Sequence, residues 1–143
     1  MVFRGTWEYT IDDRGRVPLP ARYREAFADG LVLREGLDGC LEVYTQEGYE
    51  RWAQFVESRG PHQLRARRIR RGVFGRSFDA ELDAQGRVLI PARCSQHADL
   101  EGPIIIVGSG ECLEIWNRQR WEAEEALVDQ EYGRDLESME ERP

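Results

Sequence analysis

The sequence contains no lysine, only three cysteines and two histidines, and no long apolar run. Its longest aliphatic segment, Ile104–Val107, is far shorter than the roughly 20 residues of a membrane-spanning helix. An odd number of cysteines without a C-x-x-C pair argues against a disulfide framework or a zinc ribbon. We therefore expect no membrane span, no metal and no cofactor, with Cys40, Cys94 and Cys112 as buried or half-buried thiols.

The first residues, Met1–Trp7, lack the charged and then apolar pattern of a secretory leader, so we expect a cytoplasmic protein. The apolar content of 41% and the charged content of 33% are typical of a folded chain rather than a disordered one. At 143 residues, the chain is close to one domain of about 150 residues.

All twenty basic residues are arginine, and the net charge of −7 is unevenly distributed. Residues 1–110 hold sixteen acids and sixteen arginines, so the whole deficit lies in residues 111–143. Arginine suits bidentate contact with phosphate or guanine better than lysine does, although codon bias in a GC-rich genome explains the composition equally well. A negative total does not exclude a nucleic-acid partner, because what matters is whether arginines share one face.

The chain repeats itself. Residues 11–22 align with residues 82–93, and seven of the twelve positions are identical. Cys40–Tyr44 then matches Cys112–Trp116. Two copies of about 40 residues are too few for a solenoid, so the repeat predicts one pseudo-symmetric body built from two halves.

Both copies predict the same order of elements, with strands, an Asp-x-x-Gly-Arg turn and a short helix. Strands are expected over residues 6–11, 16–19, 31–33, 40–44, 87–90, 104–107 and 112–116. Helices are expected over residues 21–27 and 92–98, where Pro20 and Pro91 stand at positions that suit the start of a helix.

Further helices are expected between and after the copies. Thr45 should cap a helix running to about Ser58, and Gly60-Pro61 should open a second helix that continues through Arg71. Asn117 should cap the last helix, which we expect to fray beyond Val128 because the sequence there is acidic with few apolar anchors.

The two turns are the first candidate functional site. Each places an arginine, Arg16 or Arg87, directly after a turn glycine, Gly15 or Gly86, and four residues after an aspartate. The aspartates, Asp12 and Asp83, are suited to hold the loop or the guanidinium. Two symmetry-related arginines on one surface would suit a DNA groove. One such turn alone favours a plain hairpin turn with an idle exposed arginine, but the repeat favours function, because it keeps the glycine and the arginine while Asp13 and Arg14 change.

The second candidate site is the arginine-rich segment between the copies, residues 59–76, which contains no acid. One interpretation is a phosphate-binding patch. The other is a helix whose arginines pair with acids of a neighbouring subunit, for which residues 111–143 are a source. The sequence leaves both open.

Catalysis finds no support in the sequence. Asp12 and Asp13 are adjacent and would point to different sides, which makes a poor acid–base pair. No P-loop, G-x-S-x-G or G-x-G-x-x-G motif occurs in the sequence. We therefore do not expect an enzyme.

The motifs, taken together, resemble the bacterial MraZ family of the AbrB-like superfamily. The resemblance runs from Phe3 to about Glu124 and rests on motifs that occur in the family's order. They are Phe3–Thr6, Asp12–Pro20, Leu41–Tyr44, Arg67–Gly75, Gly86–Pro91 and Leu113–Trp116.

This resemblance implies an α+β fold in which two tandem AbrB-like halves form a pseudo-twofold, swapped-hairpin β-barrel with flanking helices. The implied organisation is a first repeat over residues 5–47, an arginine-rich helical connector over 48–76, a second repeat over 77–120, and a C-terminal helix and acidic segment over 121–143.

The resemblance also implies a function, namely repression of the operon for cell division and wall synthesis. The protein would bind short direct repeats in its own promoter, as a nucleoid-associated, ring-shaped homo-oligomer on double-stranded DNA. Implied DNA contacts are Arg14, Arg16 and Arg87, with Asp12, Gly15, Asp83 and Gly86 in support. The alternative is a protein-interaction module that regulates an enzyme through its helices and acidic segment.

Overall fold

A computed structural model of the chain describes residues 1–58 and 63–139, and it is an α+β fold with antiparallel strands. The strands are β1 (Thr6–Thr10), β2 (Arg16–Pro18), β3 (Leu31–Glu35), β4 (Leu41–Thr45), β5 (Ser77–Ala80), β6 (Arg87–Leu89), β7 (Pro103–Gly108) and β8 (Leu113–Asn117). The helices are η1 (Ala21–Phe27), α1 (Gln46–Glu57), α2 (Leu64–Phe74), α3 (Ala92–Ala98) and α4 (Arg118–Glu137). The expected strands and helices of both copies are therefore present.

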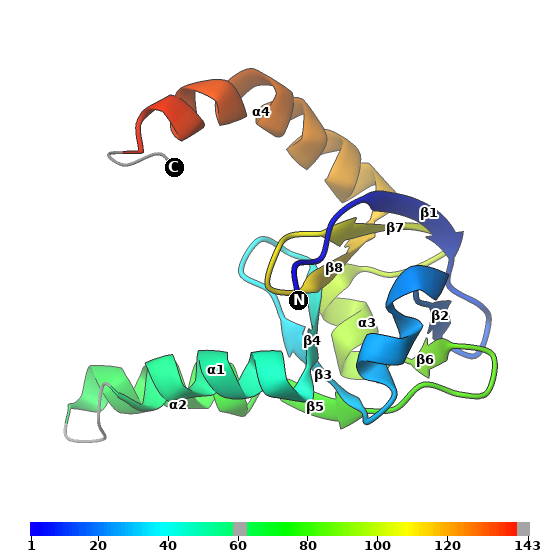
Figure 1. The fold of residues 1–143 in the computed structure, drawn as a ribbon, viewed down its shortest axis with the longest axis horizontal. Coiled ribbons are helices and arrows are strands. Elements are labelled where there is room, and N and C mark those ends of the chain that lie inside the picture. Colours follow the sequence, from blue (N-terminus) through cyan, green and yellow to red (C-terminus); the bar gives the residue numbers. More distant parts are fainter. Residues whose placement is uncertain (59–62, 140–143) are drawn as a thin grey trace.

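Six strands form one sheet in the order β1-β7-β8-β4-β3-β5 (Figure 1). The hairpin β3–β4 of the first copy lies beside the hairpin β7–β8 of the second, with Val43 opposite Leu113 where β4 pairs with β8. Strand β1 of the first copy adds to β7, and strand β5 of the second copy adds to β3. Each copy thus supplies the outer strand of the other copy's hairpin.

Strands β2 and β6 form a separate two-stranded sheet, in which Val17 lies opposite Val88. Both valines are fully buried. The expected closed barrel is not seen in the described part of the chain: β1 and β5 are the edges of an open sheet, because β2 and β6 pair with each other instead of joining those edges.

The core lies between these sheets and the two short helices. Its fully buried members include Leu33, Val43, Ile106 and Ile115 from the central strands. The short helices add Phe27 from η1 and, among others, the thiol of Cys94 from α3. All three cysteines are buried and free, as predicted, and burial raises the pKa of the Cys94 thiol to about 11.

The element that follows Pro20 differs in kind from the expected helix. Residues 21–27 form a 3-10 helix, in which the Tyr23 N–H donates to the carbonyl of Pro20 and the Ala28 N–H donates to that of Glu25. These bonds span three residues rather than four, so the helix winds more tightly than an α-helix.

The longer helices lie outside the core (Figure 1). The Thr45 and Asn117 side chains cap α1 and α4, as predicted, by accepting the backbone N–H of Gly48 and Arg120. The described part of α2 begins at Leu64 and continues past Arg71 to Phe74, while the expected start at Gly60-Pro61 lies outside the described residues.

The expected fraying of the last helix beyond Val128 is wrong, since α4 continues to Glu137. Five of the nine residues 129–137 are glutamine, glutamate, arginine or leucine, which are strong helix formers, and the Arg134–Glu131 pair adds support in this part of the helix. Across residues 1–58 and 63–139, no helix has the length and apolar character to cross a membrane.

The exchange of outer strands makes a prediction about folding. We expect neither 1–58 nor 63–143 alone to fold as a monomer, because each would lack an outer strand of its hairpin and the partner of Val17 or Val88. Far-UV circular dichroism with sedimentation velocity measures this, and mixing the halves should restore the spectrum of the intact chain. A cooperative thermal transition from either monomeric fragment would contradict the prediction.

Candidate nucleic-acid interface

The first turn is organised around the carboxylate of Asp12. Its Oδ1 accepts the backbone N–H of Arg14 at 2.9 Å and that of Arg16 at 2.8 Å, and its Oδ2 accepts the Arg16 Nε at 2.7 Å. Gly15 takes a φ of +82°, a conformation that favours glycine. One aspartate therefore fixes both the backbone of the turn and the direction of the arginine that follows it.

The second turn repeats this geometry. Asp83 Oδ1 accepts the backbone N–H of Gln85 and of Arg87, both at 2.9 Å, and Asp83 Oδ2 accepts the Arg87 Nε at 3.0 Å. Gln85 replaces Arg14 and accepts the Arg87 Nη2 through its side-chain oxygen at 3.2 Å. Gly86 has a φ of +76°.

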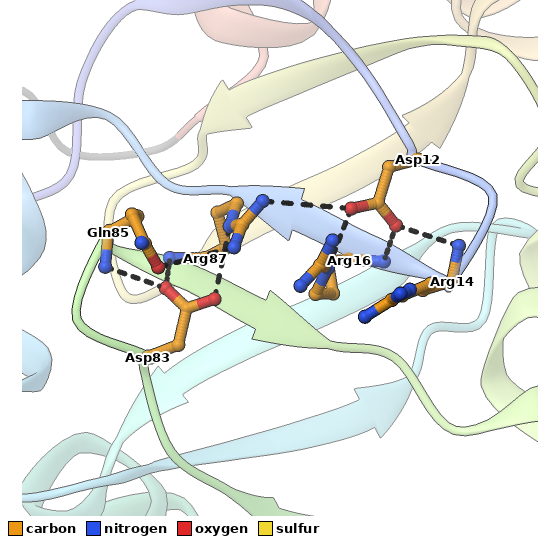
Figure 2. Close-up of polar contacts among 6 residues, drawn as sticks. All are labelled: Asp12, Arg14, Arg16, Asp83, Gln85 and Arg87. Carbon is orange, nitrogen blue, oxygen red and sulfur yellow. Dashed lines mark hydrogen bonds and ion pairs between the residues drawn. The ribbon is translucent and has the colours of Figure 1, made fainter.

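The pairing of β2 with β6 brings the two turns together (Figure 2). Arg87 lies opposite Pro18, and Arg16 lies opposite Leu89. Because side chains alternate along a strand and both central valines point into the core, these four residues lie on the outer face of the pair. Arg87 Nη1 also lies 3.8 Å from Asp12 Oδ2, so the two turns share an ion pair. We call these four residues and Arg14 the β2–β6 face.

Hydrogen bonding sets the charge state of both aspartates. The backbone N–H of Arg16 lowers the pKa of Asp12 below its ordinary value of 3.8, and the backbone N–H of Arg87 does the same for Asp83. Both carboxylates are therefore ionised at neutral pH. Since each holds its arginine at Nε, a ligand approaching the face would meet the Nη ends of the guanidinium groups.

Pro18 and Leu89 were not predicted from the sequence to be part of this surface. Leu89 is 60% exposed, which is unusual for a leucine in the middle of a structured motif. The repeat could have indicated them, because Pro18 and Leu89 occupy equivalent positions, each two residues after an arginine that is identical in both copies. The two halves of the face therefore share their arginines and differ at their apolar residues.

A second difference between the halves lies behind the turns. The Arg24 Nε donates to the carbonyl of Leu19 at 3.0 Å, and the same side chain lies against Gly86, where an added Cβ would come within 2.4 Å of it. At Gly15 the nearest atom to an added Cβ is the Ile90 carbonyl oxygen at 3.5 Å. Gly86 is thus constrained by packing as well as by φ.

The second candidate site is separate from the first. The five arginines of α2 lie on a helical hairpin that projects away from the β2–β6 face (Figure 1). The Arg70 guanidinium packs over the ring of Phe74 at 5.6 Å. Arg59 lies outside the described residues. The fold therefore brings the turn arginines together and leaves the α2 arginines on a surface of their own.

Neither surface resembles a catalytic or metal centre. The carboxylates of Asp12 and Asp83 hold their turns and are paired with arginine. In the described ranges, no three histidine, cysteine, aspartate and glutamate side chains are grouped so as to hold a metal ion. The arrangement offers cationic hydrogen-bond donors at fixed positions, which is the chemistry that binds anions.

The glycines give a matched pair of stability predictions. Gly15→Ala should cost about 1–2 kcal/mol, because it forces an L-residue into the left-handed region. Gly86→Ala should cost more, because the new Cβ also displaces Arg24 from its bond to Leu19. Urea denaturation of both variants measures the difference, and equal free energies of unfolding would contradict the packing role of Arg24.

The aspartates give a prediction in pH. Because the pKa values of Asp12 and Asp83 are lower in the folded protein than their ordinary value of 3.8, the ionised carboxylates stabilise the turns fully at pH values above 3.8. This stabilisation is lost as the pH falls through the pKa of the folded state. The backbone amides of Arg16 and Arg87 should therefore keep their protection down to a pH below 3.8. Hydrogen exchange measured by NMR checks this, with Asp12→Asn as the non-titrating control. Loss of protection above pH 3.8 would contradict it.

Comparison with known proteins agrees with this repeated architecture. The family model described as "MraZ protein, putative antitoxin-like" matches residues 2–72 and again residues 73–137. Three curated relatives named "Transcriptional regulator MraZ" are 39%, 39% and 33% identical, from Heliobacterium modesticaldum, Moorella thermoacetica and Dehalococcoides mccartyi. The alignments cover 84%, 85% and 98% of this chain and 84%, 85% and 99% of the relatives. The chain therefore belongs to the MraZ family.

Proposed function

We propose that this chain is a sequence-specific DNA-binding transcriptional regulator, acting as a repressor, and that the β2–β6 face reads the DNA. The observation that carries the proposal is the strand pairing that sets Arg16 and Arg87 on one outer surface, each held by an aspartate of its own turn. The relatives named as transcriptional regulators support the same conclusion.

The arginines have distinct roles in this proposal. A guanidinium held at Nε presents its Nη groups in a fixed plane, which suits bidentate contact with O6 and N7 of guanine in the major groove. Arg16 and Arg87 are therefore assigned to bases. Arg14 is exposed at the tip of its turn, where Gln85 stands in the other copy, and is assigned to a phosphate.

The assembly belongs to the same proposal. We infer that the chain acts as a ring-shaped homo-oligomer of swapped-hairpin subunits in the cytoplasm, associated with the nucleoid. It would bind short direct repeats in the promoter of its own operon, which serves cell division and wall synthesis. One pair of arginines per chain gives weak binding, and several subunits on successive repeats supply avidity. In this proposal the β2–β6 face of each chain supplies the sequence specificity, and the oligomer supplies the affinity.

Replacing the turn arginines tests the proposal. Arg16→Ala and Arg87→Ala should each lower specific affinity by about 1–3 kcal/mol per site, and the double variant should nearly abolish it without unfolding the protein. A gel shift with the duplex upstream of the chain's own coding region measures this. Arg51→Ala is the matched control, because that arginine also pairs with an acid four residues earlier, Glu47, but lies on α1.

Two outcomes would contradict the proposal. Normal affinity in the Arg16→Ala/Arg87→Ala variant would remove the β2–β6 face as the reading surface. No shift of the wild-type protein at low salt, with its oligomer intact, would favour a protein-interaction module instead. Random duplex of the same length separates specific from purely electrostatic binding.

A further inference from the structure

Helix α4 is attached to the rest of the fold only near its start, among the described contacts. The Arg118 Nη1 pairs with Glu8 at 2.9 Å, and the Arg120 Nη1 donates to the carbonyls of Gly39 and His97 at 3.0 and 3.1 Å. The Trp121 ring lies 5.5 Å from that of Trp116. Beyond these contacts the helix extends away from the sheet (Figure 1), and none of its twenty residues is buried.

The projecting part of α4 carries an apolar stripe that a solitary helix does not need. Val128, Tyr132 and Leu136 recur every four residues and therefore share one face, and they are 39%, 61% and 51% exposed. A helix that holds its shape in a protein normally does so by packing such a stripe against another element. The stripe points to a partner outside this copy of the fold.

Charge indicates what the partner must offer. Helix α4 contains seven acids and three arginines, and Glu125, Asp129 and Asp135 fall on or beside the apolar stripe at helical spacing. Arg134 falls toward the opposite side. Two α4 helices packed through this stripe would set acid against acid, which disfavours self-pairing of α4. The partner surface is therefore basic, with some exposed apolar residues.

The same chain displays such a surface on α2. This helix holds five arginines and no acid in eleven residues. Its apolar residues Leu64 and Ile69 are 48% and 43% exposed, and a surface hollow is lined by Gln63, Arg65, Ala66 and Ile69. Gly72 lies on the same side one turn further along, with open space around it, so a second helix can approach closely.

The two surfaces are well separated within one copy, since α4 and the α1–α2 hairpin project from different parts of the sheet (Figure 1). We propose that α4 of one copy docks on α2 of the next, with its apolar stripe on Ile69 and Leu64 and its acids against the α2 arginines. Such a contact joins unlike surfaces, so it propagates head to tail and closes into a ring or continues as a filament. This inference rests on the self-association in the proposed function and names the surfaces that produce it.

Charge reversal on each surface tests the contact. The α4 variant is Asp129→Arg/Asp135→Arg, and the α2 variant is Arg65→Glu/Arg68→Glu. Each should weaken association on the order of tenfold or more in sedimentation velocity at low salt. Glu131→Arg/Glu137→Arg is the matched control, because at helical spacing these two acids of α4 lie farthest from the stripe, on the side of Arg134, so their reversal should leave the oligomer intact.

Mixing the variants identifies the geometry. The α4 variant keeps its α2 surface, the α2 variant keeps its α4 surface, and the two reversed surfaces complement each other, so the mixture should form alternating oligomers that neither variant forms alone. All four reversals in one chain should restore assembly. Tyr132→Ser should weaken it without changing the charge.

Several results would overturn the proposal. Normal assembly of the α2 variant alone would mean that α4 pairs with itself or with another surface. Normal assembly combined with weaker binding to random duplex would mean that the α2 arginines bind phosphate instead. A wild-type protein that is monomeric at all concentrations would remove self-association, while the gel shift with the upstream duplex would still report separately on DNA binding.

Discussion

The pairing of β2 with β6 is the contact on which both the fold and the candidate site depend. Val17 and Val88 meet across the two copies of the repeat and close the core from one side. On either side of each valine the side chains point outward, namely those of Arg16 and Pro18 in β2 and of Arg87 and Leu89 in β6. A single antiparallel register therefore buries two valines and sets the spacing of Arg16 and Arg87. A slip of one residue in this register would turn the arginines inward and the valines outward. The position of the arginines is therefore fixed by the same pairing that fixes the core.

The two halves of the fold resemble each other more closely than the two halves of the β2–β6 face do. Strand exchange, turn geometry and positive-φ glycines recur in both halves, whereas Pro18 faces Arg87 and Leu89 faces Arg16. Arg24 supports only the second turn among the described contacts. Under the proposed function, a face with two unlike halves gives each chain a direction along the duplex. The inferred contact of α4 with α2 gives the assembly a direction as well, which suits repeats that all point the same way.

Local chemistry made much of this predictable from the sequence. The Asp-x-x-Gly-Arg turns, the Thr45 and Asn117 caps and the strand positions follow from residues close together in the chain, and the structure confirms them. The repeat predicted a pseudo-symmetric body. The partner of each strand was not predictable from the residues, because β1 reaches β7 and β5 reaches β3 across long separations that local propensity does not encode. The same limit explains the open sheet where a closed barrel was expected, and the exposure of Leu89.

Hydrogen–deuterium exchange of the full-length protein, with and without the duplex upstream of its own coding region, shows whether the two turns form one DNA-reading surface, because it reports on every segment at once. If they do, protection should increase at residues 12–18 and 83–89 together, at the same DNA concentration. Protection confined to residues 63–76, or to one of the two turns alone, would contradict it.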